Sequence, residues 1–276
     1  QMKKRILAWV LALVMIVGLL PTITLAADLS GSGTKDDPYL IATANDLVTF
    51  RDKVNATKKG TSTLCGKLTA NIDLSSLSGD WTPIGNYVNS YSDYTYYAGT
   101  FDGAGHTISG LYINSAKKYQ ALFGYVKNGT IKNLTVGGSV KTSSNQAAGI
   151  VAYGSSVTME NCTNEVDVTA TKKGYAAGVV ANASSGSTLT KCKNEGAIQG
   201  KGDYVGGIVA SGSSVTIENC LNSGNIVNTG EPKSVNYCTG GIAGSLSGAT
   251  MKRCGNTGAI NSTIKRTGGV VGGFGG

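Results

Sequence analysis

The stretch from Gly149 to Ala170 reads GIVAYGSSVTMENCTNEVDVTA and holds most of one repeat unit. It opens with a glycine followed by two apolar residues, and the same opening recurs along the chain at uneven intervals. The openings begin at Gly124, Gly149, Gly178, Gly207, Gly241 and Gly269. A persistent frame with varying intervals indicates a repeat architecture whose loops differ in length.

Further columns of like residues run through the aligned units. The central apolar column contains Ile108, Ile131, Met159, Leu189, Ile217 and Met251. Three residues later stand Leu111, Leu134, Cys162, Cys192, Cys220 and Cys254. Two residues beyond these stand Ile113, Val136, Asn164, Asn194, Asn222 and Asn256. An interval of two keeps side chains on one face of a strand, whereas an interval of three marks a corner.

These units predict an all-β fold, a right-handed parallel β-helix (solenoid) of about seven coils. Each unit offers short strands separated by turns of Gly, Ser, Asn and Thr, and none shows helical periodicity. A unit of this length cannot bury its apolar face alone, but stacked units can. A β-propeller is the alternative, although its blades usually need ~40 residues and four strands.

The N-terminus is typical of a signal peptide over residues 1–27. A positive region from Lys3 to Arg5 precedes an apolar run from Ile6 to Leu20, and Ala26 suits a cleavage site. The run is short for a membrane span, which needs about 20 residues; an uncleaved anchor is the alternative, and no other membrane segment is expected. Either way, we expect the rest of the chain to be secreted or displayed at the cell surface.

Residues 28–64 are predicted to form an N-terminal cap segment with a short helix, and residues 65–276 to form the β-helix repeats. Thr43 suits the N-cap of this helix, which would cover the open edge of the first coil. Its apolar stripe contains Leu47, Phe50 and Val54. At the other end, Gly268 to Gly276 begins a new unit and stops, so we expect further coils or domains to follow in the natural protein.

Composition excludes several classes of protein. The 276 residues include 40 Gly but only 4 Pro, which argues against collagen-like and proline-rich disordered chains. The formal net charge is +8, yet the basic residues are scattered and form no block of five or more. We therefore expect no nucleic-acid partner.

Several segments resemble the GLUG-motif β-helix proteins of Gram-positive bacterial surfaces. They include Gly207-Ile208-Val209-Ala210, Gly241-Ile242-Ala243-Gly244, Gly269-Val270-Val271-Gly272, Trp81-Thr82-Pro83-Ile84-Gly85 and the run from Gly99 to Ile108. The resemblance implies a parallel β-helix of an adhesin or cell-wall-associated protein, or an accessory region beside the protease domain of an IgA-cleaving enzyme. The chain contains no His-Glu-x-x-His motif, so protease activity is not implied for it.

The 6 cysteines of an exported chain suggest disulfides. Four of them, however, would stack one per coil with parallel Cβ vectors, which holds Cβ atoms farther apart than the ~3.8 Å typical of a disulfide. We interpret them as a structural ladder of buried thiols, with disulfides as the alternative. The ladder contains Cys162, Cys192, Cys220 and Cys254. Their spacing is not that of a CxxC site, so we expect no metal.

The asparagine column predicts a second structural ladder. Stacked amides can donate to the next carbonyl along the stack, as in cross-β assemblies, and this satisfies polar groups at an inward corner. The ladder contains Asn164, Asn194, Asn222 and Asn256. Ligand contact is the alternative for these side chains.

An aromatic loop is the best candidate for recognition. It contains Tyr87, Tyr91, Tyr94, Tyr96 and Tyr97. Tyrosine offers a flat, rigid contact area with a polar tip, so stacking on a sugar or a partner protein is the hypothesis. Packing of these rings on the first coils is the alternative.

No catalytic or cofactor-binding residue is predicted. His106, the only histidine, sits in a turn without a nucleophile elbow nearby, and the carboxylates of the coils take solvated positions. We therefore predict a non-enzymatic surface module with a structural or adhesive role, whose partner is a glycan or a host or bacterial surface protein. The alternatives are a carbohydrate-active hydrolase or lyase, which would need two carboxylates across a groove, and an accessory region of a larger surface protease.

Overall fold

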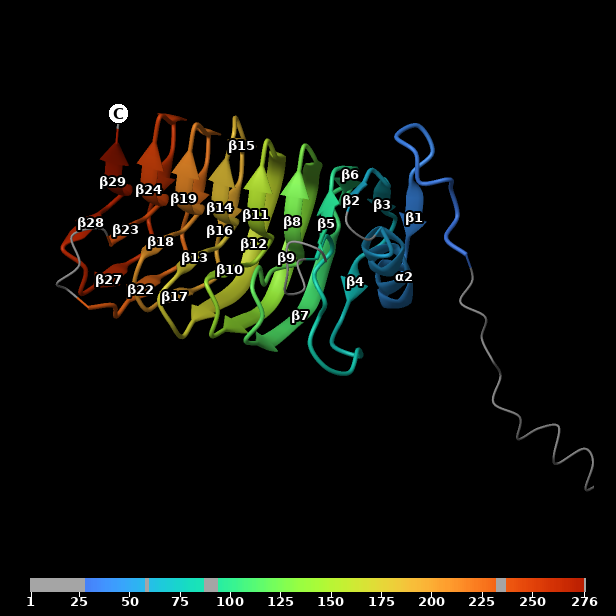
Figure 1. Cartoon of the computed structure of the whole chain (residues 1–276), viewed down its shortest axis with the longest axis horizontal. Helices are drawn as coiled ribbons and strands as arrows, with labels where there is room; N and C mark the ends of the chain where they lie inside the picture. Colours follow the sequence, from blue (N-terminus) through green and yellow to red (C-terminus); the bar gives the residue numbers. More distant parts are fainter. Residues whose placement is uncertain (1–27, 58–59, 87–93, 232–236, 276) are drawn as a thin grey trace, which may run out of the picture.

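The computed structural model describes residues 28–57, 60–86, 94–231 and 237–275. Over these ranges the chain is a parallel β-solenoid of about eight turns with a single short helix near its N-terminal end, so the predicted all-β solenoid is confirmed (Figure 1). The signal peptide predicted for residues 1–27 lies outside the described residues.

The strands of the described residues form three sheets, and every pairing between them is parallel. Along sheet A lie β1 (Tyr39–Ile41), β3 (Gly66–Leu68), β6 (Thr100–Asp102), β9 (Thr130–Thr142), β12 (Thr158–Ala170), β15 (Thr188–Thr190), β20 (Thr216–Glu218) and β25 (Thr250–Lys252). Sheet A also contains β4 (Ile72–Asp73), β7 (Thr107–Ser115), β16 (Lys193–Asn194), β17 (Ile198–Gly200), β21 (Leu221–Asn222), β22 (Ile226–Asn228), β26 (Gly255–Asn256) and β27 (Ile260–Ser262).

Two smaller sheets complete each turn of the solenoid. Sheet B contains β2 (Gly60–Ser62), β5 (Thr95–Tyr97), β8 (Phe123–Lys127), β11 (Val151–Ser155), β14 (Val180–Ser184), β19 (Val209–Ser213), β24 (Ala243–Ser247) and β29 (Val271–Gly275). Sheet C contains β10 (Gln146–Ala148), β13 (Tyr175–Ala177), β18 (Tyr204–Gly206), β23 (Cys238–Gly240) and β28 (Arg266–Gly268).

Sheet A begins one rung earlier than the sequence indicates. Strand β1 lies in the segment predicted as a cap, yet it pairs with β3 in the register Tyr39↔Gly66 to Ile41↔Leu68. Strand β2, from the same segment, pairs with β5. This additional rung explains why the solenoid has about eight turns rather than about seven.

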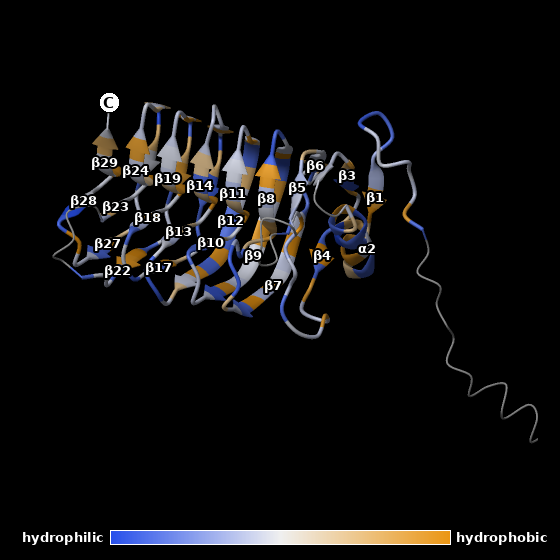
Figure 2. Cartoon of the chain, in the orientation of Figure 1, coloured by the Kyte–Doolittle hydropathy of each residue, from blue (hydrophilic) through white to orange (hydrophobic). Residues whose placement is uncertain are grey.

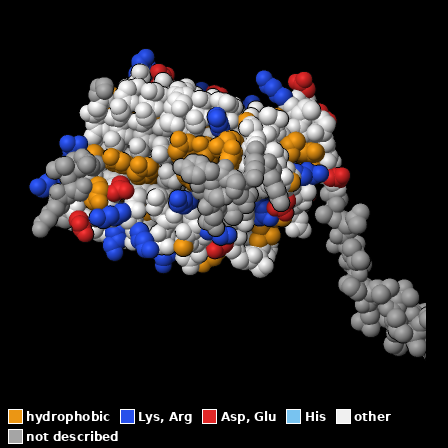
Figure 3. All heavy atoms as spheres, viewed as in Figure 1, with side chains coloured by type: hydrophobic (Ala, Val, Ile, Leu, Met, Phe, Trp, Pro, Cys, Tyr) orange, Lys and Arg blue, Asp and Glu red, His pale blue; other side chains and the backbone are white. Residues whose placement is uncertain are grey.

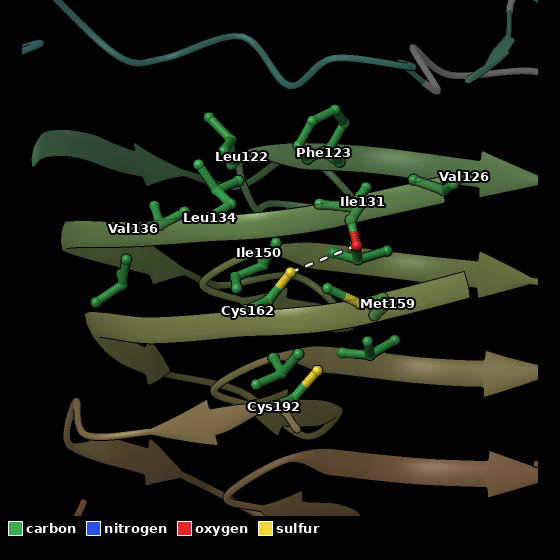
Figure 4. Packing of buried hydrophobic residues seen from close by; sticks show 14 of the residues in the cluster. Leu122, Phe123, Val126, Ile131, Leu134, Val136, Ile150, Met159, Cys162 and Cys192 are labelled. Carbon is green, nitrogen blue, oxygen red and sulfur yellow. Dashed lines mark hydrogen bonds between the residues drawn. The ribbon is translucent and has the colours of Figure 1, made fainter. Parts of the chain in front are cut away.

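Like side chains stack from rung to rung in the core. Met159 lies opposite Leu189, and Leu189 lies opposite Ile217, all three fully buried. Figure 4 shows this packing around Met159, with Cys162 and Cys192 beside it. Along β9 and β12 the inward apolar residues alternate with outward polar ones, which gives these ribbons their banded colouring in Figure 2. The period of two follows from strand geometry.

The columns of like residues aligned from the sequence are wrong for the unit before β8. Phe101, and not Ile108, lies opposite Ile131. Ile108 lies opposite Val136 instead. The register of β7 against β9 then shifts between Ile108 and Leu111. An irregularity of this kind adds residues to one strand without changing the stacking of the rungs, so spacing alone does not reveal it.

The frame at Gly124 is also misplaced. Phe123 lies opposite Val151 in the pairing of β8 with β11, so Ala121 takes the position that Gly149 takes in the next rung. The repeat unit therefore begins at Ala121 and not at Gly124, which makes it longer than the glycine frame indicates. Gly124 lies inside β8, where a Cβ atom would come within 2.5 Å of the carbonyl oxygen of Gly85.

Left-handed residues make the corner that the interval of three predicts. Asn161 has φ 52° and directly precedes Cys162. Its equivalents in other rungs have φ between 52° and 55° and are Asn133, Lys191, Asn219 and Arg253. One residue in this region turns the chain and breaks the alternation, and asparagine adopts the region more readily than most residues.

The predicted cap helix is confirmed as α2 (Ala44–Asn55), which lies over the end of the first coil (Figure 1). Its N-cap is Thr43, which forms a reciprocal capping box with Asp46. The predicted stripe of Leu47, Phe50 and Val54 is fully buried. The Phe50 ring packs 5.7 Å from that of Phe101, measured between centroids. The helix thereby closes the apolar end of the solenoid.

Candidate functional site

The five tyrosines predicted to contact a ligand have different positions. Tyr87 and Tyr91 lie outside the described residues. Tyr94 and Tyr96 are half-buried, with ring centroids 4.6 Å apart. Tyr97 points inward because side chains alternate along β5, and it is fully buried against rings of α2 and β8. The prediction of ligand contact is therefore wrong for Tyr97, and packing on the first coils applies to it.

Tyr96 starts a ladder of rings on the outer face of sheet B. Its centroid lies 4.4 Å from that of Tyr125, and the centroid of Tyr125 lies 4.6 Å from that of Tyr153. Tyr125 and Tyr153 are directly opposite in the register of β8 and β11. The Tyr119 ring lies 5.9 Å from both of them. Beyond Tyr153 the column continues with Asn182, so the ladder's aromatic part covers the N-terminal rungs.

Two more tyrosines join this surface from sheet C. Tyr175 and Tyr204 are opposite in the register of β13 and β18, with centroids 5.2 Å apart. Tyr119 and Tyr175 pack on one cluster of fully buried alanines where sheets B and C meet. We call the whole set the tyrosine belt, and it contains Tyr94, Tyr96, Tyr119, Tyr125, Tyr153, Tyr175 and Tyr204. Figure 3 shows hydrophobic side chains gathered in a band across this face.

The belt is rigid and uncharged. Burial raises the pKa of Tyr125, Tyr175 and Tyr204 above the usual tyrosine value. Their phenols therefore stay protonated at neutral pH and can donate hydrogen bonds. Strands hold the rings of Tyr96, Tyr125, Tyr153, Tyr175 and Tyr204, so these side chains have little entropy left to lose when a ligand stacks on them.

The cysteine ladder lies inside the solenoid, away from the belt. The six cysteines all lie within the described residues, and the structure joins no pair of them in a disulfide. The Sγ atom of Cys162 donates to the carbonyl of Ile131 at 3.4 Å (Figure 4). The thiol of Cys220 donates in the same way to Leu189, at 3.5 Å. The thiols thus fill small inward positions, and those of Cys162, Cys220 and Cys254 donate to the backbone of the preceding rung.

These thiols give stability a predictable pH dependence. Each thiol donates a hydrogen bond to the cysteine of the preceding rung, which stabilises the protonated form; together with burial, this raises the pKa of Cys192 well above its usual value and that of Cys220 to about 12. Since the unfolded thiols ionise near pH 8.5, stability is fully present below that pH and is lost as pH rises toward 12. We expect the midpoint of urea unfolding to fall between pH 8.5 and pH 11. The free energy of unfolding should drop over this interval by up to about 1.4 kcal/mol per thiol per pH unit.

A Cys220→Ala variant provides the control for this prediction. It should lose less stability over the same pH interval because one titrating group is gone. An unfolding midpoint that stays constant from pH 8.5 to 11 would contradict the buried, protonated ladder.

The asparagine ladder forms a continuous chain of side-chain hydrogen bonds. The Nδ2 atom of Asn164 donates to Oδ1 of Asn194 at 2.7 Å, and the Nδ2 of Asn194 donates to Oδ1 of Asn222 at 2.6 Å. Asn222 donates in turn to Asn256 at 2.6 Å. Each Nδ2 also donates to a carbonyl two residues later in its own chain, as Asn194 does to Gly196 at 3.0 Å. The first three side chains are fully buried, which leaves no access for a ligand.

A pocket of about 650 Å³ lies between α2, the segment after β4 and strand β7. Its walls include Arg51, Asp80, Trp81 and Tyr112. The guanidinium of Arg51 lies 4.8 Å from the Trp81 ring centroid and 2.8 Å from the Asp52 carboxylate. The Trp81 indole donates to the carbonyl of Leu122, and the Asp80 carboxylate accepts from the backbone of Asn114. Because the polar groups of Arg51, Asp80 and Trp81 already have partners within the protein, we interpret the pocket as part of the cap's attachment.

A groove of about 470 Å³ lies along the loops that lead into sheet C. Three exposed lysines line it, and we call them the basic edge: Lys172, Lys173 and Lys201. Glu231 is the acidic side chain of the lining, with its carboxylate 3.8 Å from the Lys173 Nζ. The Tyr237 phenol and the Glu231 carboxylate raise the pKa of Lys173. The lining therefore keeps an excess of positive charge.

Metal and membrane motifs are absent from the part of the chain that the structure describes. No group of three or more His, Cys, Asp or Glu side chains there could hold a metal ion. No helix within the described ranges is long and apolar enough to span a bilayer.

Comparison with known proteins finds partial likeness. No family model matches the chain. Halomucin of Haloquadratum walsbyi is 30% identical over 173 residues, which is 60% of this chain but 2% of that protein. A protein of Evansella cellulosilytica, provisionally named a Gly-rich membrane protein, is 33% identical over 114 residues, which is 41% of this chain and 12% of that protein. The chain thus spans a small part of both relatives.

A solved structure shares the fold. It is a protein of Bacteroides ovatus, provisionally named an immunoglobulin A1 protease, with a TM-score of 0.63 and 20% identity. The match covers 87% of this chain and 85% of the other. At this identity the likeness concerns architecture alone.

Proposed function

We propose that this chain is a non-catalytic module of an exported cell-surface protein, and that it adheres to glycans or surface proteins through the tyrosine belt. The observation that carries the proposal is the belt itself: half-buried tyrosine rings from consecutive rungs, fixed at centroid distances of 4.4 to 5.9 Å. Half-buried aromatic rings with polar tips suit stacking on sugars and contact with proteins.

Three further points support a surface location. The segment over positions 1–27 has the composition of a signal peptide. One partial relative is named a membrane protein. The GLUG-like segments resemble those of Gram-positive surface proteins, for which a solenoid that holds binding loops away from the cell is a useful scaffold.

The carboxylates of the coils support a non-catalytic role. Glu218 lies 3.7 Å from the Nζ of Lys252 and 3.4 Å from a guanidinium nitrogen of Arg253. Asp102 lies 3.3 Å from the Nζ of Lys132. Such surface ion pairs are the ordinary environment of a solvated carboxylate.

Removing two rings of the belt tests the proposal. In the Tyr125→Ala/Tyr153→Ala variant, we expect affinity for glycans or surface proteins bound by the wild type to fall at least tenfold per ring, since one lost ring contact is worth about 1.4 kcal/mol or more. Binding to a glycan array followed by titration calorimetry measures the loss.

The matched control changes the same column farther along the axis. The Asn182→Ala/Ser211→Ala variant alters positions that are opposite one another in β14 and β19 and lie beyond the aromatic rungs. It should bind like the wild type, and both variants should keep the far-ultraviolet dichroism of the parent. Equal binding by the belt variant and the wild type would show that the belt is not the contact surface.

A further inference from the structure

The basic edge and the tyrosine belt are parts of the same rungs. Lys173 is followed after one glycine by Tyr175, and Lys201 is followed two residues later by Asp203 and then Tyr204. The pairing of β13 with β18 places these two rungs side by side. Each rung therefore presents first a cation at the edge and then an aromatic ring on the face. Figure 3 shows Lys and Arg side chains gathered below the hydrophobic band.

The pattern repeats along the axis. In the rung of β8, Lys117 and Lys118 are exposed and directly precede Tyr119. In the last described rung, Lys265 is exposed just before β28, but Arg266 takes the register position of Tyr204, so no ring follows the cation there. Cations therefore recur along the solenoid at intervals of one or two strand spacings of about 4.8 Å, and rings accompany them on the rungs of Tyr119, Tyr175 and Tyr204. A polymer with a regular repeat would therefore contact cations on several rungs.

The uncharged groups of the groove suit hydroxyl-rich ligands. Beside the lysines, the lining contains Ser143, Asn145, Thr171 and Thr229. Hydroxyl and amide groups donate and accept hydrogen bonds, as sugar hydroxyls do. The acidic groups near the lysines are Glu231, which pairs with Lys173, and Asp203, which contributes to the raised pKa of the same amine. Lys172 and Lys201 are exposed, and neither belongs to an ion pair described for this groove.

We propose that the basic edge, with Tyr175 and Tyr204, binds an anionic polysaccharide whose chain runs along the solenoid axis. The inference rests on the proposed adhesive function and names the class of its ligand. The lysines neutralise the acidic groups of the polymer, and the two rings stack on its sugar faces. The attraction is electrostatic and exposed to solvent, so it weakens as salt shortens the screening length.

The test uses polygalacturonate as the anionic probe and dextran of similar length as the neutral one. We expect the wild type to bind polygalacturonate in 0.05 M NaCl and to bind it at least tenfold more weakly in 0.5 M NaCl. Its affinity for dextran should be no higher than its affinity for polygalacturonate in 0.5 M NaCl. The Lys172→Gln/Lys173→Gln/Lys201→Gln variant should lose at least tenfold in affinity for polygalacturonate. Microscale thermophoresis measures each affinity.

A control variant carries the same loss of charge on sheet A. It is Lys67→Gln/Lys193→Gln/Lys252→Gln, at three exposed positions of β3, β16 and β25. It should bind polygalacturonate like the wild type. If both variants lose affinity equally, net charge and not the edge explains the binding, and the inference fails.

Other outcomes separate the inference from the proposed function. If the wild type binds neutral glycans or surface proteins through the belt but not polygalacturonate, the inference is wrong and the adhesive function stands. If it binds none of these, both are wrong. If single-stranded DNA binds more tightly than polygalacturonate and the edge variant abolishes that binding, the edge serves nucleic acid and the assignment to polysaccharide is overturned.

Discussion

Replacing Asn194 with alanine is expected to lower the free energy of unfolding by about 4 kcal/mol. The side chain is fully buried in the middle of the asparagine ladder. Its removal leaves three buried groups without a partner: one hydrogen of the Asn164 amide, the Oδ1 atom of Asn222 and the carbonyl of Gly196. Each such group costs about 1–3 kcal/mol, less whatever relaxation recovers. Urea unfolding followed by circular dichroism measures the change.

The end of the ladder provides the comparison. Asn256 is only half-buried, and its removal takes one side-chain partner away from Asn222. We expect Asn256→Ala to cost about 1–2 kcal/mol, since solvent can replace part of what is lost. A loss below 1 kcal/mol for Asn194→Ala, or equal losses for both variants, would contradict a buried and fully bonded ladder.

Replacing Gly178 with alanine is expected to destabilise the protein by about 3 kcal/mol or more. A Cβ atom at this position would lie 2.0 Å from Oδ1 of Asn194 and 2.6 Å from the carbonyl oxygen of Gly207. Neither atom can move away easily, because Asn194 is fixed by the ladder and Gly207 by the next rung. Overpacking of a filled core costs about 1–3 kcal/mol, and contact with backbone raises that cost. Thermal and urea unfolding measure the effect.

The same motif offers a matched control at Gly269, which begins the last Gly-apolar-apolar opening. A Cβ atom there meets nothing within 4 Å. We expect Gly269→Ala to change stability by no more than about 0.5 kcal/mol, as most surface substitutions do. If both substitutions lower the stability equally, the motif requires glycine for its backbone conformation and not for the space that the asparagine side chain occupies.

The glycine and asparagine columns explain why the fold was readable from the sequence. Each glycine faces the asparagine of its own turn, as Gly149 faces Asn164 and Gly178 faces Asn194. In the rung of β8, Ala121 stands in the glycine position, and Val136 stands in the asparagine position of the same turn. Where the amide is absent, the glycine is not required. Two columns that are coupled in this way produce a sequence frame that survives changes of loop length.

Aligning the units on the Gly-apolar-apolar openings prevented the tyrosine belt from being predicted. Aligning Gly124 with Gly149 moves the unit of β8 by three residues, so that Tyr125 no longer matches Tyr153. The register shift in β7 has the same effect on the columns of the preceding unit. Bulges and extra residues preserve rung stacking while they change spacing, and a linear alignment cannot detect them. The clustering of tyrosines in the sequence indicated the loop around Tyr94 as the contact surface instead.

The direction of Tyr97 shows a second limit of the sequence. Alternation along β5 sends Tyr96 outward and Tyr97 inward, but a run of tyrosines does not indicate where the alternation begins. The inward ring is accommodated because α2 brings Phe50 to within 6.2 Å of it. Only the docking of the cap decides which tyrosine belongs to the core.

Distances along one outer column of sheet A test the stacked architecture most directly. The register places Lys67, Asp102, Lys132, Glu160, Thr190, Glu218 and Lys252 on successive rungs. Spin labels attached through ketone-bearing residues avoid the native thiols. Pulsed dipolar spectroscopy from position 67 to positions 190, 218 and 252 should give distances of about 19, 24 and 29 Å, which correspond to four, five and six strand spacings. Distances that do not increase by one strand spacing per rung would contradict the solenoid on which the ladders, the belt and the basic edge all depend.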